Sequence, residues 1–360
     1  MKKDSSINDV LKNFGIYSVI EKYGNGIIND TYLVKQKEFI VQRINTNVFK
    51  NPDELMENIY NVTSFLKEKI IQNGGDPQRE TLTVIKTIDG KNYYRSKTGD
   101  CFRVYNFIKD TKTIEISSSA QDMYNAGKGF GKFVSMLNDF PVGKLHETIK
   151  DFHHTPKRVE ALKNAINEDI KDRVKLCEDD IEFALKTAQI ADRVTNELEA
   201  GNLPVRVVHN DTKINNLLFD SKTGEPICVI DLDTVMPGSL LYDFGDALRI
   251  GASSAPEDEV DLDKVYFNTD LFKGFAKGYL ESAMDKLTKK EVELLAFSAK
   301  LITYECGIRF LTDFLNGDTY FKTTRENHNI DRARNQFKIV RDIDNKMDEL
   351  NRIIEELYIK

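Results

Sequence analysis

Two short polar sites, joined by a pattern of two apolar strands and a turn, constrain this chain most. The first site is Asp211, followed five residues later by Asn216, and the second is Asp231, which ends the apolar run Ile227–Ile230. Gly224 can turn the chain between the two strands, so the second strand is expected to run back along the first. Such a hairpin returns Asp231 to the same end as Asn216.

An aspartate, an asparagine and a second aspartate in this order are typical of the phosphoryl-transfer sites of kinases. The order predicts that Asp211 orients and deprotonates an attacking hydroxyl, and that Asn216 and Asp231 hold the magnesium ions that bridge the phosphates of ATP. Lys213, in the same loop, can offset charge on the transferring phosphoryl group. Each piece alone is common, since an aspartate after a strand often only caps a helix. Their order on a strand–turn–strand background favours kinase chemistry.

The composition describes a folded chain without a strongly basic surface. The 360 residues are 40% hydrophobic and 30% charged, which allows two lobes with cores of their own. The net charge of −7 argues against nucleic acid or an anionic membrane as a partner. The four cysteines form no C-x-x-C pair and are interpreted as buried, reduced thiols. Because the sequence contains neither a signal peptide nor a membrane-spanning apolar stretch, a cytoplasmic protein is expected. The oligomeric state stays open, and a monomer is compatible with the sequence.

The first 110 residues are expected to form a β-rich N-lobe that covers the nucleotide. Asn51-Pro52 predicts the start of a helix, since asparagine caps a helix and proline fits its first position. Apolar residues then recur on one face of that helix. The expected strands are Tyr32–Val34, Glu38–Ile44 after the turn Lys35–Lys37, a hairpin of Thr83–Ile88 with Asn92–Arg95 around Asp89-Gly90, and Cys101–Ile108.

Residues 111–360 are expected to form a mainly helical C-lobe that carries the catalytic hairpins at 205–233 and binds the substrate. Thr288 and Glu291 have the spacing of a capping box, which marks the start of a helix. The order of elements predicts an α+β chain with a protein-kinase-like, two-lobed fold. The expected helices are Met123–Leu137, a mostly continuous amphipathic helix over Pro156–Ala200, Leu271–Leu280, Thr288–Thr303, Cys306–Leu315 and a polar helix from about Asp331.

A glycine-containing turn, Gly24-Asn25-Gly26, precedes the first expected hairpin. Glycine lets backbone amides approach an anion closely, although most Gly-x-Gly turns bind nothing. The turn is not a Walker A loop, because no Gly-Lys-Ser/Thr follows, and not a dinucleotide fingerprint, because a strand comes next. Its place in a strand-rich lobe predicts a loop that covers the nucleotide.

Protein kinases place a lysine in the third strand to hold the ATP phosphates. Here the matching run offers Gln42 or Arg43, and strand alternation decides which of them faces the nucleotide. Arg43 supplies the needed charge and is assigned to the nucleotide site, with a surface charge as the alternative. Its ion-pair partner on the following helix would be Glu54 or Glu57.

The run Arg103–Ile108 ends the strands of the first lobe and is expected to be the hinge, whose backbone reads the adenine edge. Tyr105 and Phe107 are therefore assigned to the nucleotide site. None of these side chains is diagnostic by type.

Further polar residues leave alternatives open. Asp233 is the next acidic candidate, for metal or for substrate, whereas Asp243 and Asp246 are expected to cap or brace helices below the catalytic loop. Arg309 lies in a helix too apolar to be fully exposed. From the residues alone, a pair with Asp313 one turn later is favoured over a position in a binding cleft.

The catalytic loop and the metal strand resemble the aminoglycoside phosphotransferase and choline kinase superfamily, whose members have a protein-kinase-like fold. Over almost the whole chain, with similar spacing, the sequence also resembles the bacterial N-acetylhexosamine 1-kinases. The motifs that carry this resemblance are Val208–Lys213, Ile230–Ser239, Asp243–Asp246, Glu305–Leu311, Gly26–Tyr32, Phe102–Tyr105, Asp151–Pro156 and Gly317–Phe321.

The resemblance implies an ATP- and Mg²⁺-dependent kinase that phosphorylates the anomeric hydroxyl of an N-acetylhexosamine. By position, Asp211 would be the base, Asn216 and Asp231 the metal ligands, and Arg309 a contact to the sugar. Ile27 stands where the family pattern has a histidine near the sugar. Isoleucine cannot donate a hydrogen bond to a sugar hydroxyl, so the resemblance does not fix which hexosamine or epimer binds.

Two other functions compete with this interpretation. A kinase of another small alcohol, such as an aminoglycoside, choline or homoserine, would favour acidic residues in the acceptor pocket, whereas Arg309 favours a neutral sugar. An inactive nucleotide-binding regulator is supported only by the missing lysine of the third strand. The intact Asp211, Asn216 and Asp231 argue against it.

Overall fold

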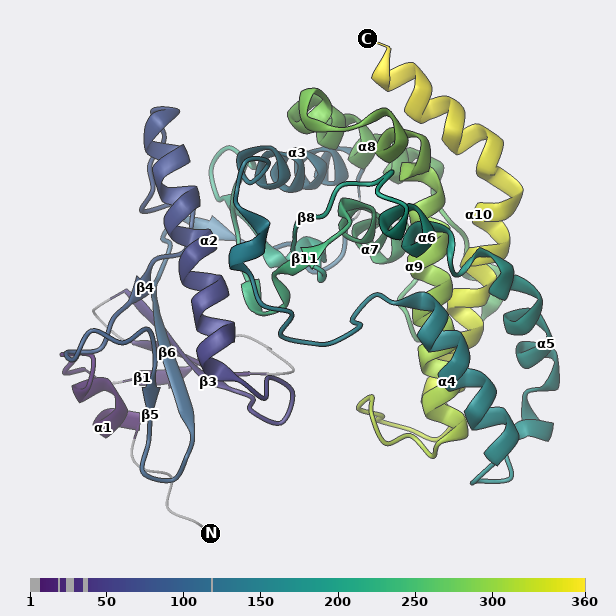
Figure 1. Ribbon diagram of the computed structural model, residues 1–360, viewed down its shortest axis with the longest axis horizontal. Helices are drawn as coiled ribbons and strands as arrows, with labels where there is room; N and C mark the ends of the chain where they lie inside the picture. Colours follow the sequence, from purple (N-terminus) through teal and green to yellow (C-terminus); the bar gives the residue numbers. More distant parts are fainter. Residues whose placement is uncertain (1–6, 19, 24–28, 35–37, 118, 360) are drawn as a thin grey trace. The chain divides into compact units, whose positions relative to one another are not determined.

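The computed structural model describes residues 7–18, 20–23, 29–34, 38–117 and 119–359 (Figure 1). An antiparallel sheet near the N-terminus is followed by a region that is mainly helical. The chain groups into two compact units, each described by itself below. The first unit contains Met1–Thr113, Met136–Lys150 and Asn216–Pro237, and the second contains Ile114–Ser135, Asp151–Asn215 and Gly238–Lys360. The expected lobe boundary between residues 110 and 111 stays a prediction.

The main sheet of the first unit has the strand order β1-β2-β3-β6-β4, with β5 also paired to β6, and every pairing is antiparallel. The strands predicted around positions 32–34, 38–44 and 101–108 are confirmed, with ends that differ by one or two residues. The turn at 35–37 lies outside the described residues. The strands are β1 (Ile20–Lys22), β2 (Asp30–Val34), β3 (Phe39–Ile44), β4 (Val84–Ile85), β5 (Tyr94–Arg95) and β6 (Cys101–Asn106).

The predicted hairpin around Asp89-Gly90 is wrong. β4 pairs with Val104 and Tyr105 of β6, and β5 pairs with Cys101 and Phe102 of the same strand. β3 occupies one edge of β6 along its whole length, so both short strands share the other edge, one after the other. A turn does connect them, but the pairing is decided by the free edge of β6.

The two faces of the sheet have different partners, because side chains alternate along a strand. Val41 of β3 lies opposite Val104 of β6, and both are buried in a core with α1 (Ile7–Lys12). Gln42 lies opposite Arg103, one position along, and therefore on the other face.

The predicted helix start at Asn51-Pro52 is confirmed by α2 (Pro52–Gln72), whose Asn51 side chain accepts a hydrogen bond from the N–H of Glu54. Its predicted apolar stripe is buried. Asn58 connects α2 to two other segments of the unit, because its amide donates to the carbonyl oxygens of His146 at 2.8 Å and Val235 at 3.0 Å. The stripe consists of Leu55, Ile59, Val62 and Leu66.

The predicted long helix over Pro156–Ala200 is wrong in its continuity. α4 ends at Glu168, its C-cap residue Asp169 has a left-handed φ of 38°, and Asp172 has a φ of 54°. These residues separate α4 from α5, and a short 3-10 helix at Ala188–Ile190 separates α5 from α6, so the segment contains three α-helices. The remaining elements of the structure are β7 (Thr111–Lys112), α3 (Ala120–Met136), α4 (Thr155–Glu168), α5 (Glu178–Thr187), α6 (Arg193–Glu199), β8 (Arg206–Val208), β9 (Leu217–Asp220), β10 (Pro226–Val229), β11 (Met236–Gly238), α7 (Leu240–Gly251), α8 (Thr269–Ala283), α9 (Lys289–Leu315) and α10 (His328–Tyr358).

The two helices predicted at 288–303 and 306–315 are one continuous helix, α9. Its start is as predicted, because Thr288 and Glu291 form the capping box. Gly307 lies inside α9 without breaking it, and the ring of Phe337 of α10 packs where a Cβ atom of residue 307 would lie. α9 and α10 lie side by side in Figure 1, and α4 and α5 complete the core around them.

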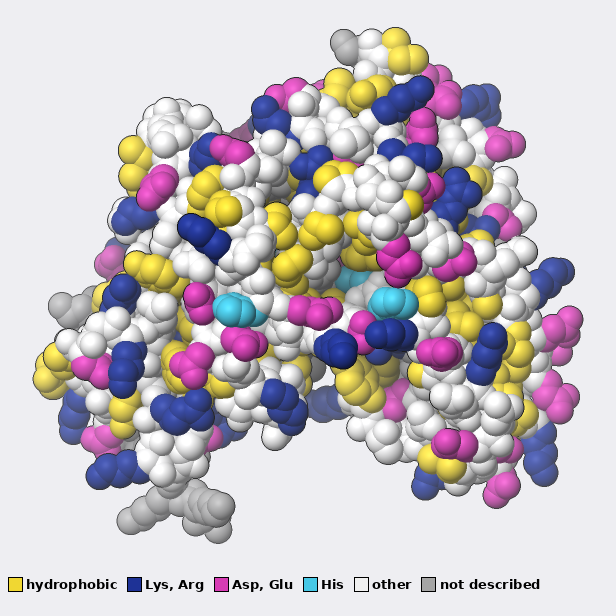
Figure 2. All heavy atoms as spheres, viewed as in Figure 1, with side chains coloured by type: hydrophobic (Ala, Val, Ile, Leu, Met, Phe, Trp, Pro, Cys, Tyr) yellow, Lys and Arg dark blue, Asp and Glu magenta, His cyan; other side chains and the backbone are white. Residues whose placement is uncertain are grey.

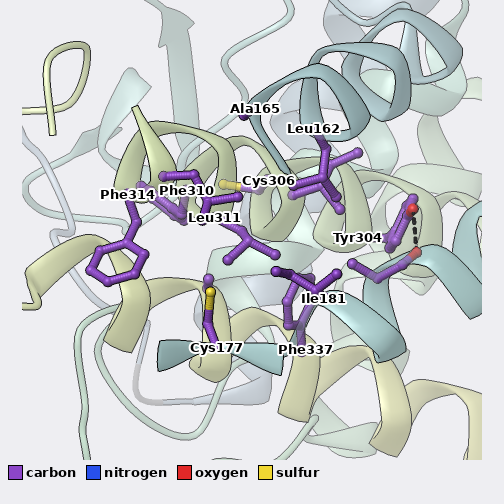
Figure 3. Packing of buried hydrophobic residues seen from close by; sticks show 14 of the residues in the cluster. Leu162, Ala165, Cys177, Ile181, Tyr304, Cys306, Phe310, Leu311, Phe314 and Phe337 are labelled. Carbon is purple, nitrogen blue, oxygen red and sulfur yellow. Dashed lines mark hydrogen bonds between the residues drawn. The ribbon is translucent and has the colours of Figure 1, made fainter. Parts of the chain in front are cut away.

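Figure 3 shows this core of the second unit, where aromatic and aliphatic side chains of α4, α5, α9 and α10 meet. The hydroxyl of Tyr304 is fully buried and donates to the carbonyl oxygen of Ala184 at 2.8 Å. A buried polar group is stabilised only when it is hydrogen-bonded, so this bond orients the tyrosine in the core.

Helices α3 and α8 approach each other so closely that only glycine fits at the contact. A Cβ atom on Gly278 would lie 2.0 Å from the carbonyl oxygen of Tyr124, and one on Gly127 would lie 2.1 Å from that of Phe275. Both obstacles are backbone atoms, which cannot move aside as a flexible side chain can. The helices therefore depend on glycine for their spacing.

Gly278→Ala is expected to destabilise the protein by about 1–3 kcal/mol, because overpacking forces the two backbones apart. Differential scanning fluorimetry should show this as a fall in Tm. Gly143→Ala is the matched control, since a Cβ atom there meets nothing within 4 Å. Equal Tm values for the two variants would show that α3 and α8 do not need this close approach.

Lysine and arginine side chains are interspersed with aspartate and glutamate side chains on the face shown in Figure 2. Within the described ranges, no helix has both the length and the apolar composition needed to cross a membrane.

Candidate active site

The loop around Asp211 is held from below by two carboxylates of α7. Asp243 accepts hydrogen bonds from the backbone N–H groups of His209 at 2.8 Å and Asn210 at 2.7 Å. Asp246 accepts one from the N–H of Thr212 at 3.0 Å. Asp243 and Asp246 were expected to cap or brace helices below the loop; in the structure their carboxylates, on α7, hold the loop itself. Hydrogen bonds from backbone amides to carboxylates are among the stronger ones, so they fix the path of the loop.

Asp243 and Asp246 are both buried, and in both cases neighbouring groups favour the ionised carboxylate, which accepts hydrogen bonds. Burial raises the pKa of Asp243 to about 6, while His209 and the two loop amides favour its ionised form. Asp246 forms an ion pair with Arg249, whose Nε atom lies 3.1 Å from Oδ1 of Asp246. Asn210 has a left-handed φ of 65°, a conformation that asparagine tolerates better than most residues.

The structure brings Asp211 and Lys213 together within this loop. The Lys213 ammonium lies 2.8 Å from Oδ1 of Asp211, and both side chains are partly exposed. Burial raises the pKa of Asp211, but the Lys213 ammonium, together with His209 and Arg249, outweighs burial and holds that pKa below its ordinary value. Asp211 is therefore an ionised carboxylate at neutral pH, which is the form that accepts a hydrogen bond from a hydroxyl.

The predicted hairpin that carries Asn216 and Asp231 is confirmed in the first unit. β9 and β10 pair antiparallel, and Gly224 has a φ of 73° in the turn between them. The N–H of Ile230 donates to the carbonyl oxygen of Asn216 at 2.9 Å. Asp231 follows at once, so the hairpin brings Asn216 and Asp231 to one end.

The donor atoms at this end of the hairpin suit a hard divalent cation. Asn216 offers an amide oxygen and Asp231 a carboxylate, and Mg²⁺ prefers oxygen ligands. Mg²⁺ usually takes one or two protein ligands and completes its shell with water and substrate phosphates. Asp231 is exposed and has a left-handed φ of 58°, which places it at the sharp turn after β10.

Asp233 belongs to a buried network of hydrogen bonds and an ion pair in the first unit. The Nη1 atom of Arg103 lies 2.5 Å from Oδ1 of Asp233, and the amide of Asn29 donates to Oδ2 at 2.7 Å. Arg103 also donates from Nε and Nη2 to Oε1 of Gln42, at 3.0 and 2.8 Å. The side chain of Arg103 is only 1% exposed, so its charge depends on these partners.

This network favours a structural role for Asp233, whose assignment to the substrate stays a prediction. Burial lowers the pKa of Arg103, but Asp233, Tyr105 and Asp231 together outweigh burial and raise it. Sequence reasoning assigned Arg103 no role, although a charged residue inside the apolar strand Cys101–Asn106 is a signal that a buried partner exists.

Comparison with known proteins decides the family. Residues 19–278 of the 360 match the model of the phosphotransferase enzyme family. The chain belongs to this family. The resemblance to the aminoglycoside phosphotransferase and choline kinase superfamily is thereby confirmed.

Solved structures resemble this phosphotransferase along nearly its whole length. A microcompartment-associated aminopropanol kinase has a TM-score of 0.60 at 15% identity, covering 97% of this chain and 99% of its own. Amicoumacin kinase in complex with AMP-PNP and Ca²⁺ has a TM-score of 0.57 at 14% identity, covering 96% of each chain. A choline/ethanolamine kinase family protein from Mesorhizobium loti has a TM-score of 0.53 at 14% identity, covering 99% of each chain. The predicted protein-kinase-like fold is confirmed.

Among the residues predicted to bind the nucleotide, the structure describes Arg43 and its alternative Gln42 but not the glycine-containing turn. Gly24, Asn25 and Gly26, and with them Ile27, lie outside the described residues. Arg43 lies on the face of the sheet opposite to Arg103 and pairs with Asp30 at 2.8 Å. Its assignment to the ATP phosphates stays a prediction that this geometry disfavours, and Gln42 is held by Arg103 on the other face.

The remaining nucleotide residues lie at the end of β6. Tyr105 is buried, and its ring lies 5.2 Å from the guanidinium of Arg103. Phe107 meets the ring of Tyr23 edge to face at 5.9 Å. Glu57 was one of the two ion-pair partners proposed for Arg43. Its Oε2 atom instead lies 3.0 Å from Nε2 of His146, and Arg43 pairs with Asp30. The hinge assignment stays a prediction.

The predicted pair between Arg309 and Asp313 is wrong. Asp313 accepts hydrogen bonds from three successive backbone N–H groups, at residues 319–321, and from the amide of Asn329. A sharp turn after α9 brings those amides back to the carboxylate, which is buried. Asp313 therefore holds a loop.

Arg309 instead lies among aromatic rings. Its guanidinium is 5.9 Å from the ring of Phe152, 6.0 Å from Tyr320 and 5.5 Å from Phe321. Phe321 and Tyr320 belong to the loop that Asp313 holds. The guanidinium is attracted to the faces of such rings and keeps its N–H donors in one plane.

Proposed function

We propose that this phosphotransferase transfers the γ-phosphoryl group of ATP, with Mg²⁺, to the anomeric hydroxyl of an N-acetylhexosamine and yields the sugar 1-phosphate. The Asp211 carboxylate, paired with Lys213 at 2.8 Å in a loop that Asp243 and Asp246 hold, is the observation that carries the reaction type. Motif resemblance and the surroundings of Arg309 support the sugar as acceptor.

Asp211 accepts the proton of the anomeric hydroxyl as its oxygen attacks the γ-phosphorus. The new oxygen–phosphorus bond forms while the bond to the β-phosphate oxygen breaks, and ADP leaves with the electron pair. Lys213 offsets negative charge near the reacting hydroxyl.

Asn216 and Asp231 would hold Mg²⁺ by their side-chain oxygens, which match its preference for hard ligands. When bound, the ion neutralises charge across the β- and γ-phosphates. The structure of amicoumacin kinase with AMP-PNP and Ca²⁺ supports an adenine nucleotide with a divalent cation in this fold.

Arg309 supports a neutral acceptor. Its guanidinium can donate charge-assisted hydrogen bonds to sugar hydroxyls or to an N-acetyl carbonyl. The neighbouring rings of Phe152, Tyr320 and Phe321 offer apolar faces to the C–H groups of a sugar. A second cation in the same place would be repelled, which disfavours choline, aminopropanol and aminoglycosides.

A panel assay of ADP release tests this proposal. The acceptors are N-acetylglucosamine, N-acetylgalactosamine, glucose, choline, aminopropanol, homoserine and kanamycin, each with ATP and Mg²⁺. We expect the highest kcat/KM for an N-acetylhexosamine. The highest value for a cationic acceptor would reject the sugar and keep the phosphotransferase chemistry.

Arg309→Met is expected to raise the KM of the sugar about 10- to 100-fold, because a hydrogen bond to a charged group contributes about 1.5–3 kcal/mol. The KM of ATP should stay nearly unchanged. The measurement is steady-state kinetics with both substrates varied, and Tm on the same preparation.

Arg193→Met is the matched control for that variant, since Arg193 also lies over an aromatic ring, that of Phe297, at 5.6 Å. It should leave both KM values as they are. If Arg309→Met lowers Tm and leaves the sugar KM unchanged, Arg309 is structural and does not touch the acceptor.

A further inference from the structure

Side chains from two sequence motifs meet beside the loop of Asp211. The Nδ1 atom of His153 lies 2.8 Å from Oε1 of Glu305, and its Nε2 atom lies 3.3 Å from the carbonyl oxygen of Asn210. The hydroxyl of Thr155 donates to the second oxygen of Glu305 at 2.6 Å. His153, Thr155 and Glu305 are all buried. The proposed reaction uses none of these three groups directly.

Both neighbours of the His153 ring are acceptors. A backbone carbonyl cannot donate, and an ionised carboxylate cannot donate either. Burial raises the pKa of Glu305, but His153, Arg309 and the Thr155 hydroxyl together outweigh burial and hold that pKa below its ordinary value. A ring that faces acceptors on both sides satisfies both only when both of its nitrogens carry protons.

The surroundings of the ring fix its position. Phe152 lies 4.7 Å away and Tyr242 lies 5.1 Å away, measured between ring centroids. Asn210 is therefore held at both of its peptide groups, with its N–H on Asp243 and its carbonyl on His153. The other charged and titratable groups that face His153 and Glu305 are Arg309 on α9, Tyr242 and Asp243 on α7, and Arg158 on α4.

We propose that His153 is a positioning residue of this phosphotransferase. In its doubly protonated form it ties the carbonyl of Asn210, next to Asp211, to Glu305 on α9. Arg309 lies one turn after Glu305 on the same helix. The bridge therefore fixes the position of the loop that carries the base, Asp211, relative to the arginine proposed to bind the acceptor. This inference rests on the proposed function and extends it to a residue that touches neither substrate.

His153→Asn should lower kcat about 10- to 100-fold, because a misplacement of about 1 Å at a reacting group costs on the order of 10²-fold. The KM of ATP should not change. His154→Asn is the matched control, since His154 is the next residue and only caps α4 through the N–H of Lys157. It should keep kcat near that of the unmodified protein.

Glu305→Gln is a second variant that keeps the shape of the side chain and removes its charge. The amide oxygen can still accept from Nδ1 of His153, but the carboxylate charge that stabilises a second proton on the ring is gone. A ring that has lost that proton turns a lone pair toward the carbonyl of Asn210. We expect kcat to fall here as well, and the double variant with His153→Asn to lose little more, because both changes break one bridge. A folded Glu305→Gln or His153→Asn variant with unchanged kcat would overturn the proposal.

Histidine NMR tests the bridge without any acceptor. The chain has five histidines, so long-range ¹H–¹⁵N spectra at neutral pH should resolve their ring nitrogens. We expect the His153 ring, identified by the loss of its signals in His153→Asn, to carry the two protons that its two acceptors require, and to lose one of them in Glu305→Gln. A neutral His153 in the unmodified protein would contradict the bridge. If N-acetylhexosamines are not phosphorylated, the proposed acceptor fails, while these spectra and kcat on the acceptor that the panel identifies still decide the role of His153.

Discussion

Asp211→Asn is expected to lower kcat about 10²- to 10⁴-fold, which is the usual contribution of a general base. The amide has nearly the shape of the carboxylate but cannot accept the proton of the hydroxyl. Nucleotide affinity, measured by calorimetry with ADP, should stay nearly unchanged, because the base acts on the acceptor. Steady-state kinetics with saturating ATP and acceptor gives kcat.

Asp285→Asn is a matched control for this change. Asp285 also forms a local ion pair, with Lys286 at 2.7 Å, and its side chain is well exposed. The control therefore shows how far kcat changes when an aspartate loses its ion pair with a neighbouring lysine away from the proposed site. An Asp211→Asn variant that retains more than about a tenth of kcat would remove Asp211 from the role of base.

Asp231→Asn is expected to lower kcat by about 10²-fold or more and to raise the Mg²⁺ concentration needed for half-maximal rate, since charge at a metal ligand is worth several kcal/mol. Asparagine tolerates the left-handed φ of 58° at this position, so the backbone should not be strained. The measurement is a Mg²⁺ titration of the initial rate at fixed ATP.

Asp233→Asn gives the contrasting result. Its carboxylate is buried against Arg103, so its loss leaves a buried charge poorly paired and should lower Tm. Asp231→Asn should leave Tm close to that of the unmodified protein. An unchanged Mg²⁺ titration in Asp231→Asn would show that Asp231 is not a metal ligand.

Local signals explain which elements the sequence predicts well. The hairpin of β9 and β10 was predicted from two apolar runs and Gly224, and the capping box of Thr288 and Glu291 places the start of α9. These features depend on residues a few positions apart. The pairing of β4 and β5 with β6 depends on which edge of a distant strand is free, and the expected hairpin between them is wrong for that reason.

The candidate site divides in the same way. A structural role for Asp243 and Asp246 was expected, but as caps or braces of helices. Their carboxylates instead bind loop amides 33 and 34 positions earlier in the chain, which no local pattern indicates. The backbone N–H partners of Asp313 lie in the turn after α9, its side-chain partner Asn329 lies in α10, and no spacing rule points to them. The pair with Arg309, favoured from the residues alone, is wrong for that reason. The bridge from His153 to Asn210 joins positions 57 residues apart, and only the folded chain reveals it.

Phosphorus NMR of the product made from ATP, Mg²⁺ and N-acetylglucosamine tests the proposed reaction most directly. We expect a phosphomonoester signal coupled to the anomeric proton of the sugar, formed in equal amount with ADP and absent when Asp211→Asn replaces the unmodified protein. A phosphate on any other hydroxyl, or ADP with inorganic phosphate alone, would contradict the assignment of this phosphotransferase as an anomeric kinase of N-acetylhexosamines.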